Sequence, residues 1–302
     1  MVAALTHHQV MASFLDFIFP FGMQEYPQDF YFSGLREETA LQSLPQGLVI
    51  PKLGRSGREI RVCYNLKSVE TSKSSREWPW SIRQTAVYHS FDVETGKSFW
   101  IVVKGSELIK DRIQEATRKG SNSSPELRSF ETTAQAFNST LATHLVLCDW
   151  CDEEWRWYLK YPEERLQDAT RRGLAIIDRD PTDMRMADDD VFTFKNLQLV
   201  QDFKEKTNEV APVLEANIDS LTEMKEHYQQ IFNSRDLPED IKANCKSEFA
   251  QFEKRVSGII TDLQRQKLRT AILQTLLGDR KSFVSLFPNI RISRQIHIVG
   301  MY

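Results

Sequence analysis

Aspartates are the residues of this sequence best suited to bind a metal ion. Six of them lie between Asp178 and Asp190, and the last three, Asp188, Asp189 and Asp190, are consecutive. Hard divalent cations take carboxylate oxygens as ligands. The spacing differs from that of an EF-hand loop, which needs alternating ligands, a central glycine and a terminal glutamate. Asp188, Asp189 and Asp190 are therefore a candidate metal site, and Mg²⁺ is the cofactor it would take.

The same three aspartates have a second interpretation that needs no metal. They directly precede a long helical pattern that begins near Asn196. Carboxylates at such a position accept hydrogen bonds from the free N–H groups of the first turn and complement the positive end of the helix dipole. We favour this capping role, with the residues before Asp188 as a solvated linker, and keep weak binding of Mg²⁺ or Ca²⁺ as the alternative.

Cys148 and Cys151 have the spacing of a redox dithiol or of half a zinc site, and His144 lies four residues before the first of them. A structural zinc ion needs four ligands, so Cys63 and Cys245 would have to come in from distant parts of the chain. A thioredoxin-like site would need a strand that leads directly into a helix at the dithiol. We favour burial of both cysteines as small apolar residues over either site.

No motif for catalysis or nucleotide binding is present. The segment Gly54–Gly57 lacks the Gly-Lys-Ser/Thr sequence of a phosphate loop, and we interpret it as a turn, with anion binding through Arg55 as the alternative. The chain has no Gly-x-Ser-x-Gly elbow, no His-Glu-x-x-His helix and no Rossmann fingerprint. We therefore predict no catalytic residue and no enzymatic activity.

Composition excludes further classes of function. The 302 residues include 39 Lys and Arg against 42 Asp and Glu, a net charge of -3, so no overall positive field attracts nucleic acid. No apolar stretch approaches the roughly 18 to 20 residues that a bilayer requires, which predicts no direct membrane insertion. Four scattered cysteines and the absence of a signal-peptide pattern indicate the reducing cytosol.

The first part of the chain predicts a mixed α/β head. Its aromatic run Phe14–Phe21 is typical of a segment that packs into a core, with the docking of a partner as the less favoured alternative. Strands are expected at Ile60–Leu66, Thr85–Val93, Ser98–Val103 and Leu145–Cys148, and helices at Ser106–Lys119 and Pro125–Ala142. The second and third strands bracket a four-residue turn with a glycine, so they should form a β-hairpin.

A different period begins near Asn196. Apolar residues recur at spacings of three and four up to Ile231, and the same pattern returns from Phe249 to Leu277. This is the heptad pattern of a helical seam, as in a coiled coil, and it predicts two long helices. Since Asp236–Glu239 supplies a stop and a fresh start, the two helices should pack antiparallel as a hairpin.

The fold class is therefore α+β, a mixed head followed by a long, stalk-like antiparallel helical hairpin. We place the head at residues 1–185 and the hairpin at residues 186–282. After Lys281, Pro288 and a β-branched, basic run do not suit a helix, so residues 283–302 should form an atypical C-terminal tail.

Several short motifs together resemble a known family. They are Ser81–Asp92, Trp100–Gly105, Phe252–Val256 and Asp279–Ser282. With these motifs the chain, from about Phe14 to Lys281, resembles the large cytosolic region of fungal CorA-like transporter-domain proteins. In CorA relatives an α/β domain is followed by long helices that lead into two membrane helices, and the assembled channel carries Mg²⁺ and related cations.

The resemblance implies the cytoplasmic head and stalk of a divalent metal cation transporter, without its membrane helices. We expect a regulatory role, no transport by this chain alone, and assembly into a homo-oligomer or with membrane transporter subunits. The alternative is a protein-interaction scaffold that binds a partner helix through the helical hairpin.

Overall fold

The computed structural model describes the backbone of residues 2–22, 32–42, 51–72, 78–104, 107–118, 125–177 and 194–299. Side chains are described for residues 3–22, 32–42, 52–72, 78–104, 107–118, 126–168 and 198–282. The chain forms two compact units. One, which we call the sheet unit, contains Met1–Glu154 and Val213–Gln264, and the other, the helical unit, contains Trp155–Pro212 and Arg265–Tyr302.

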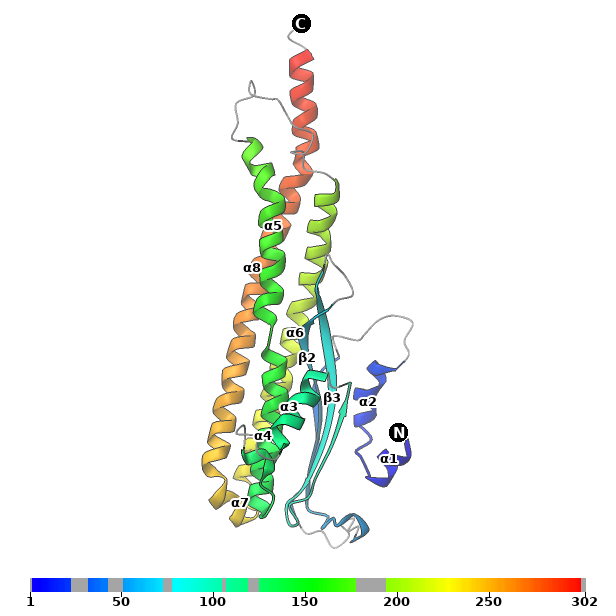
Figure 1. Cartoon of the computed structure of the whole chain (residues 1–302), viewed down its shortest axis with the longest axis vertical. Helices are drawn as coiled ribbons and strands as arrows, with labels where there is room; N and C mark the ends of the chain where they lie inside the picture. The colour runs from blue at the N-terminus through cyan, green and yellow to red at the C-terminus, as the bar shows by residue number, and fades with distance from the viewer. Residues whose placement is uncertain are drawn as a thin grey trace. The chain divides into compact units, whose positions relative to one another are not determined.

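A four-stranded antiparallel sheet forms the centre of the sheet unit (Figure 1). Its strands, in the spatial order β1-β2-β3-β4, are β1 (Leu35–Ala40), β2 (Glu59–Thr71), β3 (Trp80–Asp92) and β4 (Ser98–Val103). The predicted β-hairpin is confirmed as β3 and β4, with the positive φ of Gly96 in the connecting turn. With the helices described below, this sheet confirms the α+β class.

One face of the sheet packs against the N-terminal segment. That segment forms α1 (Val2–His7), α2 (Phe14–Ile18) and the 3-10 turn η1 (Phe19–Phe21). Met11, Phe14 and Phe17 are buried against Cys63 and Tyr88 of β2 and β3. The prediction that the aromatic run packs into the core is confirmed for Phe14 and Phe17, which meet an apolar face of the sheet, whereas Phe19 is 66% exposed.

The opposite face is covered by α4 (Thr133–Asp152) and, within the sheet unit, by part of α6. The start of α4 is fixed by a capping box, in which Thr132 Oγ1 accepts from the Gln135 backbone N–H and the Gln135 side chain accepts from the Thr132 N–H. The predicted strand at Leu145–Cys148 is wrong, since these residues are turns of α4. In so short an apolar run, the spacing of the apolar residues does not distinguish a strand from a buried helix.

Short elements complete the sheet unit. They are η2 (Pro51–Leu53), α3 (Glu107–Thr117), η3 (Pro125–Arg128) and α7 (Glu239–Asn244). The helix predicted at Ser106–Lys119 is confirmed as α3. The helix predicted from Pro125 begins only at Thr133, because the capping box lies there.

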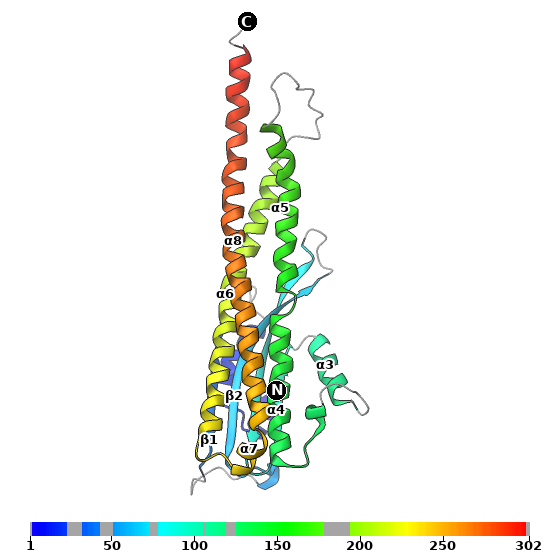
Figure 2. The same cartoon turned by 90° about the vertical axis from the view of Figure 1, so that its left-hand side faces the viewer.

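The two predicted long helices are confirmed as α6 (Phe194–Asn233) and α8 (Lys246–Val299) (Figure 2). Each of them contributes residues to both units. In the sheet unit their seams pack antiparallel, since Phe232 stacks on Phe249 and Tyr228 meets Phe252. In the helical unit, Lys281 Nζ donates to Gln201 Oε1 at 2.6 Å. The pairing follows the spacing of the apolar residues along each helix.

A helix that the sequence analysis did not include, α5 (Trp155–Ile177), joins α6 and α8 in the helical unit. Arg269 of α8 forms a bidentate ion pair with Glu163, with both N–O distances below 3 Å. The ring of Tyr161 packs on that of Phe203. The buried side chains Trp155, Tyr158, Leu159 and Leu166 recur at helical spacing, so the signal for α5 was present in the sequence.

The backbone of α8 continues to Val299. The prediction that helical structure is lost after Lys281 is therefore wrong. Pro288 lies inside this helix and does not end it, and β-branched residues lower helix propensity only slightly. The proposed division at residues 185 and 282 stays a prediction.

Candidate functional site

The predicted metal ligands Asp188, Asp189 and Asp190 lie outside the described residues, so this site stays a prediction. Within the described ranges, no group of three or more His, Cys, Asp or Glu side chains is arranged to hold a metal ion. The candidate site consists of the polar side chains that are buried between the sheet, α4 and α6.

Cys148 and Cys151 are both buried in α4 and both are free thiols. Cys148 Sγ lies 3.9 Å from Met224 Sδ of α6. Burial raises the pKa of both thiols well above its usual value, so neither is the reactive thiolate of a redox site. The structure agrees with the packing role that the sequence favoured.

His144, four residues earlier, is the centre of a buried polar network. Tyr64 Oη of β2 lies 2.8 Å from His144 Nδ1, and Tyr228 Oη of α6 lies 2.7 Å from His144 Nε2. All three side chains are fully buried. A neutral imidazole has one donor and one acceptor nitrogen, so one tyrosine donates to it and the other accepts. The three side chains thus connect the sheet, α4 and α6 through uncharged hydrogen bonds.

Burial keeps this network neutral. It lowers the pKa of His144 to about 3 and raises the pKa of Tyr64 and Tyr228 above the usual value for tyrosine. Removal of a group from water disfavours its charged form, and no carboxylate bonds to the ring to offset this. At neutral pH the network carries no charge and is suited to structure rather than to proton transfer.

A second buried imidazole, that of His89, lies beside the first. Its ring packs edge-on to His144 with centroids 5.1 Å apart and against the Trp100 ring at 4.0 Å. His89 Nε2 lies 3.1 Å from Ser98 Oγ, whereas Nδ1 has no hydrogen-bond partner in the part of the chain that the structure describes. Burial, and then the neighbouring His144, hold the pKa of His89 well below its usual value.

Strand register explains why these residues meet. Val87 is opposite Tyr64, and His89 is opposite Trp100, so these side chains share one face of the sheet. The same alternation places Cys63 and Tyr88 on the other face, with the N-terminal helices. The position of each strand residue in the network is therefore fixed by its pairing in the sheet.

An asparagine attaches α6 to the edge of β2. The Lys67 backbone N–H donates to Asn217 Oδ1 at 2.9 Å, and Asn217 Nδ2 donates to the Lys67 carbonyl at 2.6 Å. The side-chain amide thus takes the place of a neighbouring strand, and it satisfies two backbone groups that would otherwise be buried without partners. In addition, Glu223 Oε2 accepts from the Leu35 N–H of β1 at 2.8 Å. These bonds set the position of α6 and hence of Tyr228.

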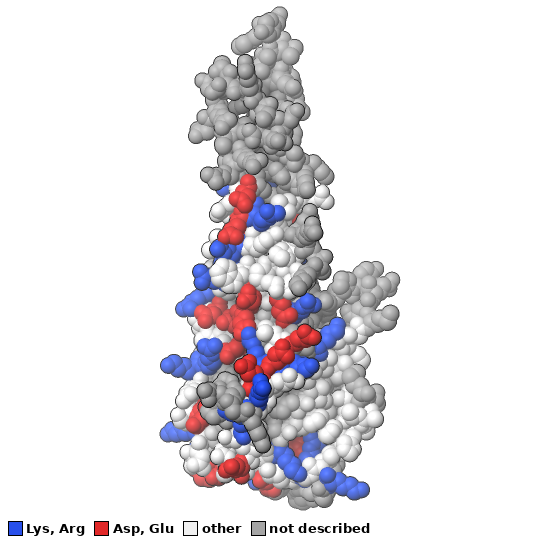
Figure 3. Space-filling model, in the orientation of Figure 1, with Lys and Arg blue, Asp and Glu red and all other residues white. Residues whose placement is uncertain are grey.

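Carboxylates gather at the end of α4 and on α8. Burial, followed by the nearby charges of Asp262 and Asp149, raises the pKa of Asp152 to about 6. Asp149 is paired with Arg255 at 2.8 Å, and Glu153 with Arg112 at 2.6 Å. Acidic and basic side chains are also interspersed on the face drawn in Figure 3. The arginines already partner two of these carboxylates, which makes the cluster an ion-pair network.

The segment Gly54–Gly57 is a turn, as predicted. Gly54 and Gly57 have positive φ angles of 64° and 86°, and the Ser56 N–H donates to Asp92 Oδ2 at 2.6 Å. Arg55 is paired with Glu59 at 2.9 Å. Because a carboxylate already occupies the guanidinium, the turn offers no free cation to an anionic ligand.

No helix within the described residues is long and apolar enough to cross a membrane. A search of characterised proteins finds no match to the chain. The family model of the CorA-like transporters matches residues 1–174, which is more than half of the 302 residues. The matched region contains the whole sheet, α4 and most of α5. The chain belongs to the CorA-like transporters.

Proposed function

We propose that this chain is the cytosolic, regulatory part of a CorA-like divalent cation transporter and does not transport ions by itself. The observation that carries the proposal is the family match over residues 1–174, since members of this family are transporters rather than catalytic enzymes. The fungal origin and the preference for Mg²⁺ rest on the resemblance of the sequence motifs.

The course of α8 supports a regulatory role. This helix starts in the sheet unit at Lys246 and enters the helical unit at Arg265 without a break. A continuous helix is stiff over this length, and a change at one end is carried to the other as a shift or rotation. In our proposal, cation binding to the chain changes the position of α8 and thereby controls the transporter.

We place the cation at Asp188, Asp189 and Asp190. Calorimetric titration of the full chain with MgCl₂ tests this. The chain should give a saturable heat that is lost in the Asp188→Asn/Asp189→Asn/Asp190→Asn variant.

A matched control removes the same charge elsewhere. Glu131, Asp202 and Glu226 are exposed carboxylates on the described surface, and Glu131→Gln/Asp202→Asn/Glu226→Gln should bind Mg²⁺ as the original chain does. Equal loss of heat in both variants would show a nonspecific charge effect. A chain without any Mg²⁺ heat would contradict the metal site.

Transport itself is tested in cells that lack their own Mg²⁺ uptake. We expect that the chain alone does not restore growth at low Mg²⁺, but that it changes uptake when a complete CorA-like transporter is produced with it. Growth with the chain alone would overturn the regulatory assignment. An unchanged uptake would contradict it as well.

A scaffold for a partner helix is the second candidate, and one observation favours it. Leu268 and Ile272 of α8 are 66% and 63% exposed and lie four residues apart, on one side of the helix. Apolar residues at this spacing are those that helix-in-groove partners use. Light scattering separates the candidates, because CorA-like proteins are typically homo-oligomers, whereas a scaffold would be a monomer until it meets its partner.

A further inference from the structure

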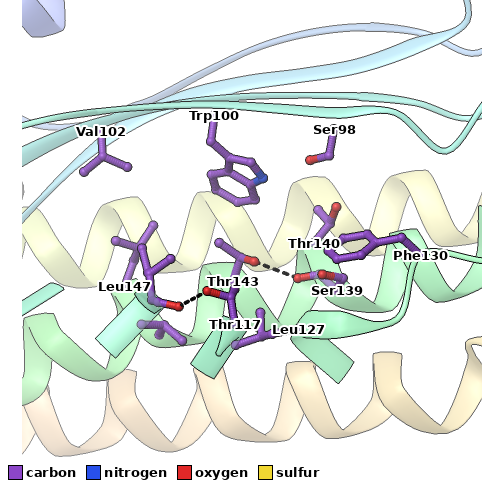
Figure 4. A pocket seen from close by; sticks show the side chains of 12 residues that line it. Ser98, Trp100, Val102, Thr117, Leu127, Phe130, Ser139, Thr140, Thr143 and Leu147 are labelled. Carbon is purple, nitrogen blue, oxygen red and sulfur yellow. Dashed lines mark hydrogen bonds between the residues drawn. The ribbon is translucent and has the colours of Figure 1, made fainter. Parts of the chain in front are cut away.

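An apolar pocket lies in the sheet unit between β4, α3 and α4. Its volume is about 290 Å³. The side chains that make most of its wall are Trp100, Val102, Ile113, Leu127, Phe130 and Leu147. Figure 4 shows the Trp100 indole reaching from β4 toward the residues of α4, with Leu127 and Phe130 on the far side. None of the residues that line the pocket is charged.

The threonine hydroxyl groups in the wall already donate hydrogen bonds to helix carbonyls. Thr143 Oγ1 donates to the Ser139 carbonyl at 2.8 Å, and Thr140 Oγ1 donates to the Ala136 carbonyl at 3.1 Å. Thr117 Oγ1 likewise donates to the Ile113 carbonyl at 2.7 Å. These threonines therefore present methyl groups and occupied hydroxyls to the pocket, and they cannot replace the hydration of a charged ligand.

Two donors are left over, the Ser139 hydroxyl and the indole N–H of Trp100. Neither group makes a hydrogen bond with a residue in the described part of the chain, and in Figure 4 the indole nitrogen is on the side of Thr140 and Ser139. The ring is held in place, because His89 packs against it with centroids 4.0 Å apart. Phe130 is 58% exposed, so the wall reaches solvent at this residue.

We propose that this pocket binds a small, uncharged molecule that is mainly hydrocarbon and carries one hydrogen-bond acceptor. The volume is at the lower end of the range of small-molecule sites, roughly 300–1,000 Å³. The apolar wall would take the hydrocarbon part, and the Trp100 N–H would donate to the acceptor. This site is independent of the proposed cation site.

Fluorine NMR with n-octanol as the probe tests the proposal. The chain has six tryptophans, and full labelling with 5-fluorotryptophan gives each its own resonance. The Trp100→Phe variant identifies the resonance of Trp100. We expect n-octanol to shift this resonance saturably and to leave those of tryptophans outside the pocket in place. The absence of a saturable shift would overturn the proposal.

A pair of threonine variants shows whether the probe occupies the pocket. Thr143→Phe fills the space between α4 and Trp100 and should weaken n-octanol binding by about tenfold or more, because the ligand would have to displace a packed ring. Thr261→Phe is the matched control. Thr261 is also on a helix and donates to the carbonyl four residues earlier, Ser257, but it is exposed and does not line the pocket.

The control variant should bind n-octanol as the original chain does. If Thr143→Phe binds equally well while its other tryptophan resonances are unchanged, the probe is elsewhere and the assignment is wrong. The charged analogue n-octanoate tests the requirement for a neutral ligand. We expect its affinity to be at least about tenfold lower than that of n-octanol. Equal affinities for the two probes would overturn this requirement.

Discussion

At the scale of single residues, the buried imidazole of His144 is the side chain from which we expect the largest effects on stability. Both of its nitrogens are bonded to tyrosines that come from other elements. A buried polar group that loses its partner retains the full cost of its removal from water. Each tyrosine hydroxyl should therefore matter more for stability than a hydroxyl at the surface.

Tyr228→Phe tests this directly. The change leaves the shape of the ring almost intact and removes the partner of His144 Nε2, so the free energy of unfolding should fall by about 1–3 kcal/mol. Urea denaturation measures the difference. Tyr88→Phe is the control, since the buried Tyr88 hydroxyl has no hydrogen-bond partner within the described residues, and it should be nearly neutral. Equal losses in the two variants would contradict the role of the network.

The neutral histidines predict how stability depends on pH. The pKa of His144 is about 3 in the folded chain against an ordinary value of 6.5, and that of His89 is also lowered. Their stabilisation is complete above pH 6.5, and it decreases as the pH falls from 6.5 toward the folded pKa, because only the unfolded chain takes up the protons.

From pH 7.5 to pH 5 the free energy of unfolding should fall by about 2 kcal/mol on account of His144, and it should fall further on account of His89. Denaturation curves at both pH values measure the loss. His144→Gln keeps a neutral polar side chain that does not titrate, so it should lose less stability between the two pH values than the original chain. An identical loss would show that other groups are responsible.

At the scale of elements, the attachment of α6 to the sheet depends on Asn217. The carboxamide bonds both backbone groups of Lys67. The carboxamide supplies a donor and an acceptor side by side, and glutamine, which carries the same group, has a longer side chain. Asn217, a buried polar residue of α6, thus helps to fix the register of this helix against β2.

Asn217→Ala should lower the free energy of unfolding by roughly 2–4 kcal/mol, because it leaves two buried backbone groups without partners. Chemical denaturation measures this loss. Asn244→Ala provides a control, since the Asn244 side chain bonds only within the short helix α7 and is exposed. The control should lose less than about 1 kcal/mol. A small effect at Asn217 would mean that packing alone positions α6.

At the scale of the whole molecule, α6 and α8 are shared by two compact units. The exposed pair Leu268 and Ile272 is in the helical unit. Apolar side chains that remain exposed on a helix are available for association. Under the proposed function this pair would contribute to self-assembly.

Leu268→Ser/Ile272→Ser should therefore shift the chain toward the monomer, as measured by analytical ultracentrifugation over a range of concentrations. The control is Leu15→Ser/Phe19→Ser in the sheet unit, a pair with the same spacing and exposures of 42% and 66%. It should leave the distribution unchanged. If neither variant changes the distribution, these surfaces do not mediate assembly.

The sequence alone determined the parts that depend on local pattern. Two strand segments on either side of a turn with a glycine predicted the β3–β4 hairpin, and the spacing of apolar residues predicted α6 and the first part of α8. These signals are local because backbone hydrogen bonds in a helix or hairpin join residues that are close in the chain. The same rules failed at Leu145–Cys148, where the apolar run is too short to show a period.

Only the tertiary structure decided which side chains meet. Tyr64 and Tyr228 are 80 and 84 residues from His144 in the sequence, and no local pattern marks them as its partners. The sequence singled out His144 only as a neighbour of Cys148. Its network, the attachment through Asn217 and the pocket at Trp100 arise from strand register and helix packing. Burial then set the charge states of the histidines and tyrosines, because the pKa of a side chain depends on its exposure to water and on its neighbours in the fold.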